Sequence, residues 1–267
     1  MIAIIKTEFW KVKRYHILLI GLIGMACSPL LQLFSQMVVV EEVRRSDFDF
    51  AALVEMTLWG DAQIFMPVIF TLIGGYLINR EYTDDTLKNI LTVPVSFRKL
   101  LVGKLLMVSL LGIILGAYSI VCVLIVSIIA GLPAINGFVL AHGLLSAAGL
   151  AVGIYVVVLP LIVIGSRKPG LFMSGSVIAF IAGYCCLFFK QGLLRSIYPF
   201  SAVLTMIGFD MSSYNGATEE GSVVLGLISL GVMMMITVAL ICFFGTPGEV
   251  QSGKKKKKNA GRGGRRK

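Results

Sequence analysis

Six long apolar stretches constrain what this chain can fold into. A helix needs about 20 mostly apolar residues to cross the hydrocarbon core of a bilayer. Stretches suited to this occupy 17–40, 62–79, 100–130, 137–165, 171–189 and 222–244. Because only 14% of the 267 residues are charged, the chain lacks the polar surface that a water-soluble fold of this size needs. The sequence therefore predicts an all-α polytopic membrane protein with six transmembrane helices, with residues 1–250 forming a single transmembrane domain.

The placement of Lys and Arg predicts the orientation of these helices. Basic residues are enriched in cytoplasmic loops. With the N-terminus in the cytoplasm, only four of the 24 Lys and Arg residues fall on the outer side: Arg44, Arg45, Lys190 and Arg195. We therefore expect a multi-pass protein of the cell (plasma) membrane with both termini in the cytoplasm.

Three further segments have distinct predicted roles. Residues 1–15 place Ile2, Ile5 and Phe9 on one helical face, which suits a helix lying in the cytoplasmic membrane interface. The apolar stretch 197–209 is too short to span, so we expect a re-entrant or interfacial segment. The basic tail 251–267 is of low complexity and predicts disorder, with attraction to membrane lipid rather than to nucleic acid.

The connection between the second and third spans is the most polar stretch in the body of the chain. Thr83 can cap a helix whose first turn carries Asp84 and Asp85, where negative charge favours the helix dipole. The apolar residues that follow share one face: Leu87, Ile90 and Leu91. Pro94 disfavours helical geometry at the preceding residue and ends the helix. The pattern predicts a short amphipathic helix on the cytoplasmic surface.

The chain lacks the residues that several other functional classes need. The chain has no GxxxxGK[ST] phosphate loop and no HExxH motif, and its five cysteines lack metal-site spacing. We therefore predict no cofactor, no metal and no enzyme activity. Glu41 and Glu42 faintly resemble the EExxxR signature of membrane-embedded prenyl-protein proteases, but Ser46 stands where Arg is required. The predicted spans contain no Asp or Glu, so an ion-coupled carrier would have no carboxylate relay.

Glycine pairs at GxxxG spacing occur in two predicted spans, at Gly112 and Gly116 and at Gly149 and Gly153. Small residues at this spacing let helix backbones approach closely. We expect them to mediate helix contacts within one bundle rather than a dedicated dimer face.

Residues 81–104, EYTDDTLKNILTVPVSFRKLLVGK, resemble a pattern of type 2 ABC exporter permeases: E-x-x-x-G-T-L, a leucine-rich turn, P-x-S and G-K. The matching residues are Glu81, Thr86, Leu87, Leu91, Pro94, Ser96, Gly103 and Lys104. Asp85 stands where the family usually has Gly. The opening IKTEFWKVKR, with Pro29, is similar to permeases of bacitracin- and lantibiotic-type peptide exporters.

This resemblance implies a partnership and a set of docking residues. Two permeases would pair, as identical copies or as homologous chains, and each would dock a separate ABC ATPase subunit in the cytoplasm. The short helix after the second span would be the coupling helix that enters a cleft of the ATPase. Its ATPase-coupling residues would be Glu81, Asp84, Asp85, Thr86, Leu87, Lys88, Ile90, Leu91 and Pro94.

The resemblance also implies a cargo. Substrate would pass between the two permeases along their second and fifth spans, where an apolar lining suits an amphipathic peptide. A peptide antibiotic exported for self-protection is the first hypothesis. Export of another amphiphile, such as a lipid or a drug, is the alternative within the class, and a non-transport membrane enzyme or scaffold is the alternative outside it.

Overall fold

The computed structural model describes residues 16–39, 48–83, 97–166, 170–216 and 221–244, together with Thr7, Phe9 and Trp10. This part of the chain folds into helices and contains no β-strand. The long elements are α2 (Ile17–Val38), α3 (Phe50–Gly60), α4 (Met66–Thr83), α6 (Phe97–Ala130), α7 (Gly137–Gly165), α8 (Leu171–Tyr184) and α12 (Val223–Phe244). The short ones are the π-helical turn η1 (Asp61–Phe65), the 3-10 turn η2 (Cys185–Phe188), α9 (Gly192–Ile197), α10 (Pro199–Met206) and α11 (Ser212–Asn215).

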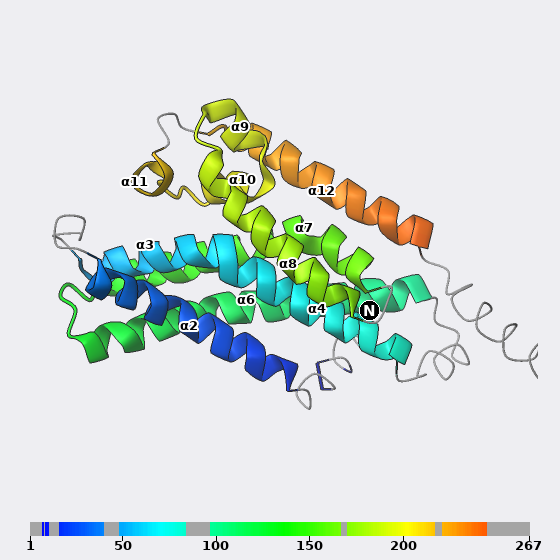
Figure 1. Ribbon diagram of the computed structural model, residues 1–267, viewed down its shortest axis with the longest axis horizontal. Coiled ribbons are helices and arrows are strands. Elements are labelled where there is room, and N and C mark those ends of the chain that lie inside the picture. The colour runs from blue at the N-terminus through cyan, green and yellow to red at the C-terminus, as the bar shows by residue number, and fades with distance from the viewer. Residues whose placement is uncertain are drawn as a thin grey trace, which may run out of the picture.

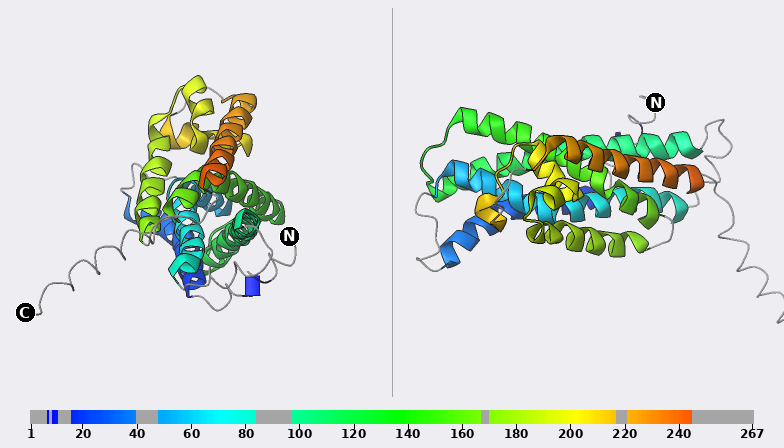
Figure 2. Two further views of the ribbon diagram at one scale, coloured as in Figure 1. Left: turned by 90° about the vertical axis from the view of Figure 1, so that its right-hand side faces the viewer. Right: turned by 90° about the horizontal axis from the view of Figure 1, so that it is seen from above.

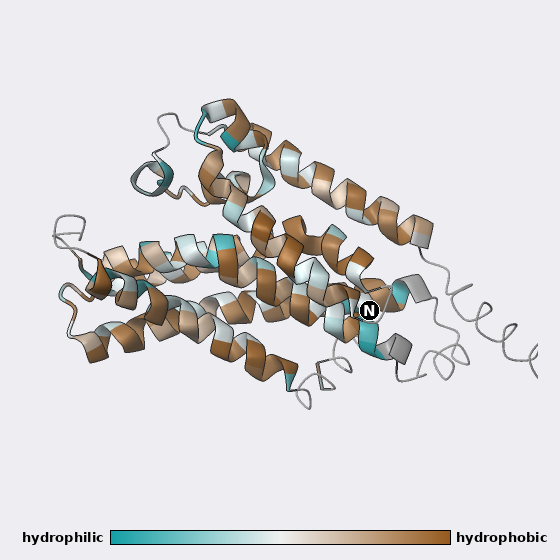
Figure 3. Cartoon of the chain, in the orientation of Figure 1, coloured by the Kyte–Doolittle hydropathy of each residue, from teal (hydrophilic) through white to brown (hydrophobic). Residues whose placement is uncertain are grey.

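Six helices of the described chain are long and apolar enough to cross a membrane, which confirms the predicted all-helical, six-span fold. They run back and forth along the long axis of the molecule, so the end of α4, the start of α6 and the end of α12 lie at one end of the bundle (Figure 1). The six helices are hydrophobic over most of their length (Figure 3). An apolar helix surface that remains exposed in one chain faces lipid or another protein in a membrane.

The second span is longer than the sequence suggested, because it begins at Phe50 rather than at residue 62. Asp49 caps its first turn, with the side-chain Oδ1 accepting a hydrogen bond from the Ala52 N–H at 2.8 Å. The helix then runs through α3, η1 and α4 as one candidate span, Phe50–Arg80. Hydropathy alone placed residues 50–61 in an outer loop, because Glu55 and Asp61 lower the average there.

The helix α7 lies at the centre of the bundle, packed against α6, α4, α8 and α12. The outer positions are taken by α2, which packs on α6 and α3, and by α12, which is largely exposed and contacts α7 and α10. Two perpendicular views show this arrangement (Figure 2). The bundle therefore leaves long apolar faces of α2, α8 and α12 uncovered.

The GxxxG glycines mediate contacts inside this chain, as expected. A Cβ atom at Gly112 would lie 3.2 Å from the ring of Phe70 on α4, and one at Gly116 would lie 3.0 Å from the Ala147 carbonyl oxygen on α7. The absence of side chains at these two positions lets α6 approach both neighbours closely.

The region between α8 and α12 folds into short helices, none of membrane length. The Ser201 hydroxyl donates to the Arg195 carbonyl oxygen at 2.6 Å, which links α10 to α9. The Ser229 hydroxyl of α12 donates to the Ile197 carbonyl oxygen at 2.7 Å. These bonds hold α9 and α10 against the first half of α12, away from the C-terminal ends of α4 and α12 (Figure 1).

Candidate functional site

The connection from α4 to α6 carries most of the predicted ATPase-coupling residues. Glu81 lies in the last turn of α4. The others lie outside the described residues: Asp84, Asp85, Thr86, Leu87, Lys88, Ile90, Leu91 and Pro94. The structure describes three residues of the predicted interfacial helix and none of the basic tail. Both segments therefore remain predictions.

The two helices that flank this connection are tied to the rest of the bundle. The Asn79 amide of α4 donates to the Ser166 carbonyl oxygen at the end of α7, at 3.5 Å. The buried Tyr155 hydroxyl of α7 donates to the Leu105 carbonyl oxygen of α6 at 2.6 Å. A force applied to the 84–96 connection would therefore act on α4, α6 and α7 together.

Pro67 explains the π-helical turn in the middle of the second span. Proline has no N–H, and in a regular α-helix its ring would clash with the carbonyl group four residues earlier, here that of Gln63. The chain widens instead, and the Met66 N–H bonds to the Asp61 carbonyl oxygen five residues back. The bulge turns the Gln63 carbonyl group toward Gly183 of α8, where an added Cβ would overlap its oxygen.

The same turn holds a buried carboxyl group inside the bundle. Ser119 of α6 donates a hydrogen bond from its hydroxyl to Asp61 Oδ2 at 2.6 Å. Ser28 of α2 faces the same carboxyl, and the three side chains are completely buried. We call Ser28, Asp61 and Ser119 the polar centre. Because a polar group in a membrane interior needs a partner, the hydrogen bond from Ser119 to Asp61 joins α6 to η1. The buried Ser28 hydroxyl of α2 has no hydrogen-bond partner among the described residues.

The hydrogen bond between Ser119 and Asp61 in the polar centre can be tested directly. Ser119→Ala removes the hydrogen bond to a fully buried carboxyl group, so we expect a loss of about 1.5–3 kcal/mol in unfolding free energy. Ser127→Ala is the matched control on the same helix, because the buried Ser127 hydroxyl has no hydrogen-bond partner among the described residues. Unfolding in mixed detergent micelles compares the two variants, and an equal loss in both would contradict the assigned bond.

Small residues set the contact between α4 and α8. Gly175, Ala179 and Gly183 follow one another at four-residue spacing on α8, and Ala179 is fully buried. A Cβ atom at Gly175 would lie 3.4 Å from the Thr71 methyl group of α4. This close antiparallel pairing joins the second and fifth spans, the two helices that the family resemblance assigns to the substrate path.

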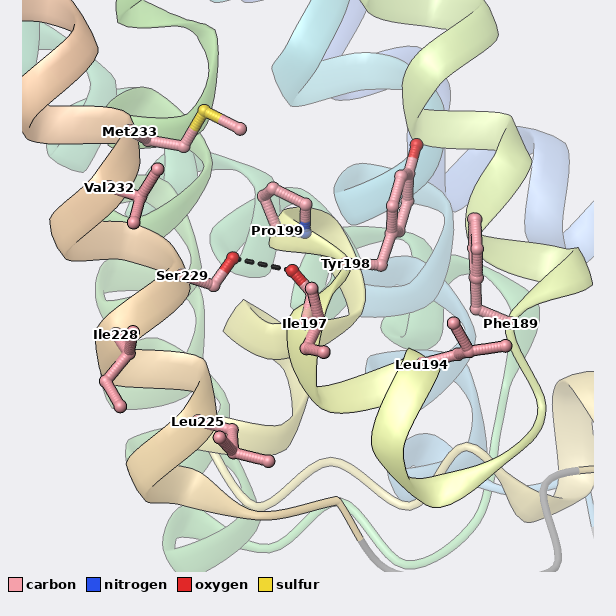
Figure 4. A pocket seen from close by; sticks show the side chains of 10 residues that line it. All are labelled: Phe189, Leu194, Ile197, Tyr198, Pro199, Leu225, Ile228, Ser229, Val232 and Met233. Carbon is pink, nitrogen blue, oxygen red and sulfur yellow. Dashed lines mark hydrogen bonds between the residues drawn. The ribbon is translucent and has the colours of Figure 1, made fainter.

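An apolar cavity of about 510 Å³ opens between α9, α10 and α12. Its wall carries Phe189, Leu194 and Tyr198 on one side and Leu225, Ile228 and Met233 on the other (Figure 4). The Ser229 hydroxyl in this wall is already bonded to the Ile197 carbonyl oxygen. The cavity can accept an apolar group, and its volume lies within the usual range of ligand sites.

The described residues contain no group of three or more His, Cys, Asp or Glu side chains that could hold a metal ion. The sequence analysis missed the buried carboxyl group of Asp61, because the predicted second span began one residue after it. Two local signals could have found it: the capping residue Asp49 ahead of an apolar run, and Pro67, which predicts an irregular helix around residue 63.

Six membrane-length helices in the described part of the chain define a multi-pass membrane protein. The particular family follows from a comparison with known families. The ABC-2 family of transporter proteins matches residues 4–186, and the chain belongs to this family. It is therefore a transmembrane permease of the ABC transporter class.

One characterised relative shares part of the sequence. The chain is 35% identical over 75 residues to the bacitracin transport permease protein BCRB of Bacillus licheniformis. The alignment spans 28% of this chain and 36% of that relative. No solved structure matches the chain.

Proposed function

We propose that this chain is the membrane-spanning subunit of an ATP-driven exporter that removes a peptide antibiotic of the bacitracin or lantibiotic type. The observation that carries the proposal is the ABC-2 family match, which runs from residue 4 to residue 186 and covers the first four spans and most of the fifth. The similarity to a bacitracin transport permease supports the class of cargo. Export would protect the cell that contains the transporter.

The ATPase would be a separate subunit, because the sequence has no phosphate loop. We place the 84–96 connection in the cytoplasm, since the basic residues favour that side. There Asp84, Asp85 and Lys88 would set the docking register, and the apolar stripe would supply contact. Movement of the ATPase would reach the bilayer through α4 and α6, which are hydrogen-bonded to α7.

A second permease, identical or homologous, would complete the transporter. The exposed apolar faces of α2 and α8 favour this arrangement, because they offer surface for helix packing in the membrane. The cargo would then pass between two copies of the α4–α8 pair. The uncovered apolar surface equally suits another amphiphile, such as a lipid or a drug, which is the alternative cargo.

A protection assay in a bacitracin-sensitive bacterial strain tests the proposal. We expect co-expression of this chain with its ATPase to raise the inhibitory concentration of bacitracin or of a lantibiotic at least about fourfold. An ATPase variant without its phosphate-loop lysine is the control and should give no protection. If the ATPase copurifies but neither peptide is tolerated better, the hypothesis of a peptide cargo is rejected. If the ATPase does not copurify with this chain, the hypothesis of an ATP-driven exporter is rejected.

A further inference from the structure

Asp61 lies inside the second span, which runs from Phe50 to Arg80 as one helix long and apolar enough to cross a membrane. At a rise of about 1.5 Å per residue, it is roughly 16 Å from the start of this helix. Its side chain is completely buried. A carboxylate in a membrane interior is costly unless an opposite charge compensates it. The structure thus adds a carboxyl group to spans that the sequence predicted to have none.

No charge among the described residues compensates this carboxyl group. Only Ser119 and Ser28 interact with it there, and both are neutral. The neighbouring helices α2, α8 and α10 contain no charged residue. The titratable Tyr118 next to Ser119 interacts with Cys122 on its own helix. The charged side chains described on α3, α4 and α6, none of which is hydrogen-bonded or ion-paired to Asp61, are Glu55, Arg80, Lys99 and Lys104.

The polar centre contains two buried oxygen atoms without a hydrogen-bond partner among the described residues: Asp61 Oδ1 and the Ser28 hydroxyl oxygen. The other carboxyl oxygen, Oδ2, already accepts from Ser119 at 2.6 Å. A proton on Oδ1 removes the negative charge and supplies a donor on the atom that has no partner. The Ser28 oxygen, which faces the carboxyl group from α2, is an acceptor for this donor.

The helix α2 closes the polar centre on one side. A Cβ atom at Gly60 would overlap the Gln32 amide of α2 and would lie 3.8 Å from the Ser28 hydroxyl oxygen. This close packing keeps the carboxyl group away from water, which is the medium that would stabilise its ionised form. A metal cation would need a larger set of oxygen ligands than one carboxyl group and two hydroxyl groups. A proton needs only the carboxyl group.

We propose that Asp61 is a proton-binding site, which at neutral pH holds one proton on Oδ1 between η1 and α2. An aspartate side chain in water is ionised at that pH. The proton is therefore taken up from water when α2 packs against the second span, and it returns to water when α2 separates from η1. This inference does not depend on the cargo or on the ATPase.

Infrared spectroscopy of the full chain at neutral pH tests the proposal, in micelles of dodecyl maltoside, which contains no carbonyl group. A protonated carboxyl group has a carbonyl band at higher frequency than carboxylate or peptide groups. We expect one such band, shifted by ¹³C labelling of aspartate and absent from Asp61→Asn, which keeps the side-chain size without an acidic proton. Asp210→Asn, which removes an exposed carboxyl group, should keep the band. Absence of the band from the unsubstituted protein would overturn the proposal.

A second variant tests the assignment without removing the carboxyl group. Ser119→Ala should raise the frequency of the band, because the hydroxyl donates to Oδ2, the carbonyl oxygen of the protonated form. Ser127→Ala on the same helix should leave the band in place, because its hydroxyl has no hydrogen-bond partner among the described residues. An equal frequency in both variants would show that the band belongs to another aspartate.

The pH dependence of unfolding gives an independent measurement. The folded chain holds a proton that the unfolded chain lacks above about pH 4, so stability falls as the pH rises. The unfolding equilibrium constant should therefore increase by up to about tenfold more per pH unit than that of Asp61→Asn. An equal pH dependence in the two proteins would overturn the proposal. Stability that depends on sodium or potassium instead of pH would overturn it in favour of a metal cation.

Discussion

Gly183→Ala is expected to destabilise the protein by about 1–3 kcal/mol, because the added methyl group meets a backbone oxygen that cannot move aside. The π-helical turn directs the Gln63 carbonyl group onto Gly183, where an added Cβ would overlap it. The Pro67 ring lies 3.3 Å from the same point. The helices α4 and α8 must separate to admit the methyl group, so the second and fifth spans lose their contact. Detergent unfolding measures the change in free energy.

Gly231→Ala on α12 is the matched control. An added Cβ there has no neighbour within 4 Å, so only the intrinsic preference of a helix for Ala remains, a gain of about 0.5–1 kcal/mol. The same gain applies at Gly183, and the difference between the two variants therefore reports the helix contact. Equal stability of both variants would show that α8 does not lie against η1.

Leu87→Asp combined with Ile90→Asp is expected to abolish copurification of the ATPase, while the permease still inserts into the membrane. The two substitutions place charges on the apolar stripe of the predicted coupling helix. Burying an unpaired charge in a docking cleft costs several kcal/mol, which lowers affinity by on the order of 1000-fold or more. Pull-down from solubilised membranes measures the loss, and blotting of the membrane fraction measures insertion.

Asn89→Asp controls for charge alone. It adds a carboxylate in the same segment, on a residue outside the stripe formed by Leu87, Ile90 and Leu91. We expect it to leave the ATPase bound. Retained binding in the Leu87 and Ile90 double variant would refute the coupling role of this segment, and loss of binding with Asn89→Asp alone would refute the assignment of the docking face.

Several features of the fold could be predicted because each depends on one stretch of sequence. The apolar runs predicted six spans, since transfer of a helix into lipid depends on its own side chains. The resemblance of residues 81–104 to exporter permeases led to the same family that the comparison of residues 4–186 shows. Prediction failed at 50–61, where Glu55 and Asp61 lowered the hydropathy although Asp61 is completely buried.

The candidate sites depended on contacts between distant residues. Asp61 accepts a hydrogen bond from Ser119, which lies 58 positions away in the sequence. The residues around either position do not indicate that the two side chains are in contact. The apolar cavity of about 510 Å³ needs α9, α10 and α12 side by side.

The sequence by itself determined that this chain has six segments able to cross a membrane, and it determined the family to which the chain belongs. Only the tertiary structure decided that η1 meets α8 at Gly183, that the Asp61 carboxyl is buried, and which side chains line the apolar cavity beside α12. The physical reason is that partition into lipid is a property of each segment, whereas packing between helices depends on the shapes of two surfaces at once.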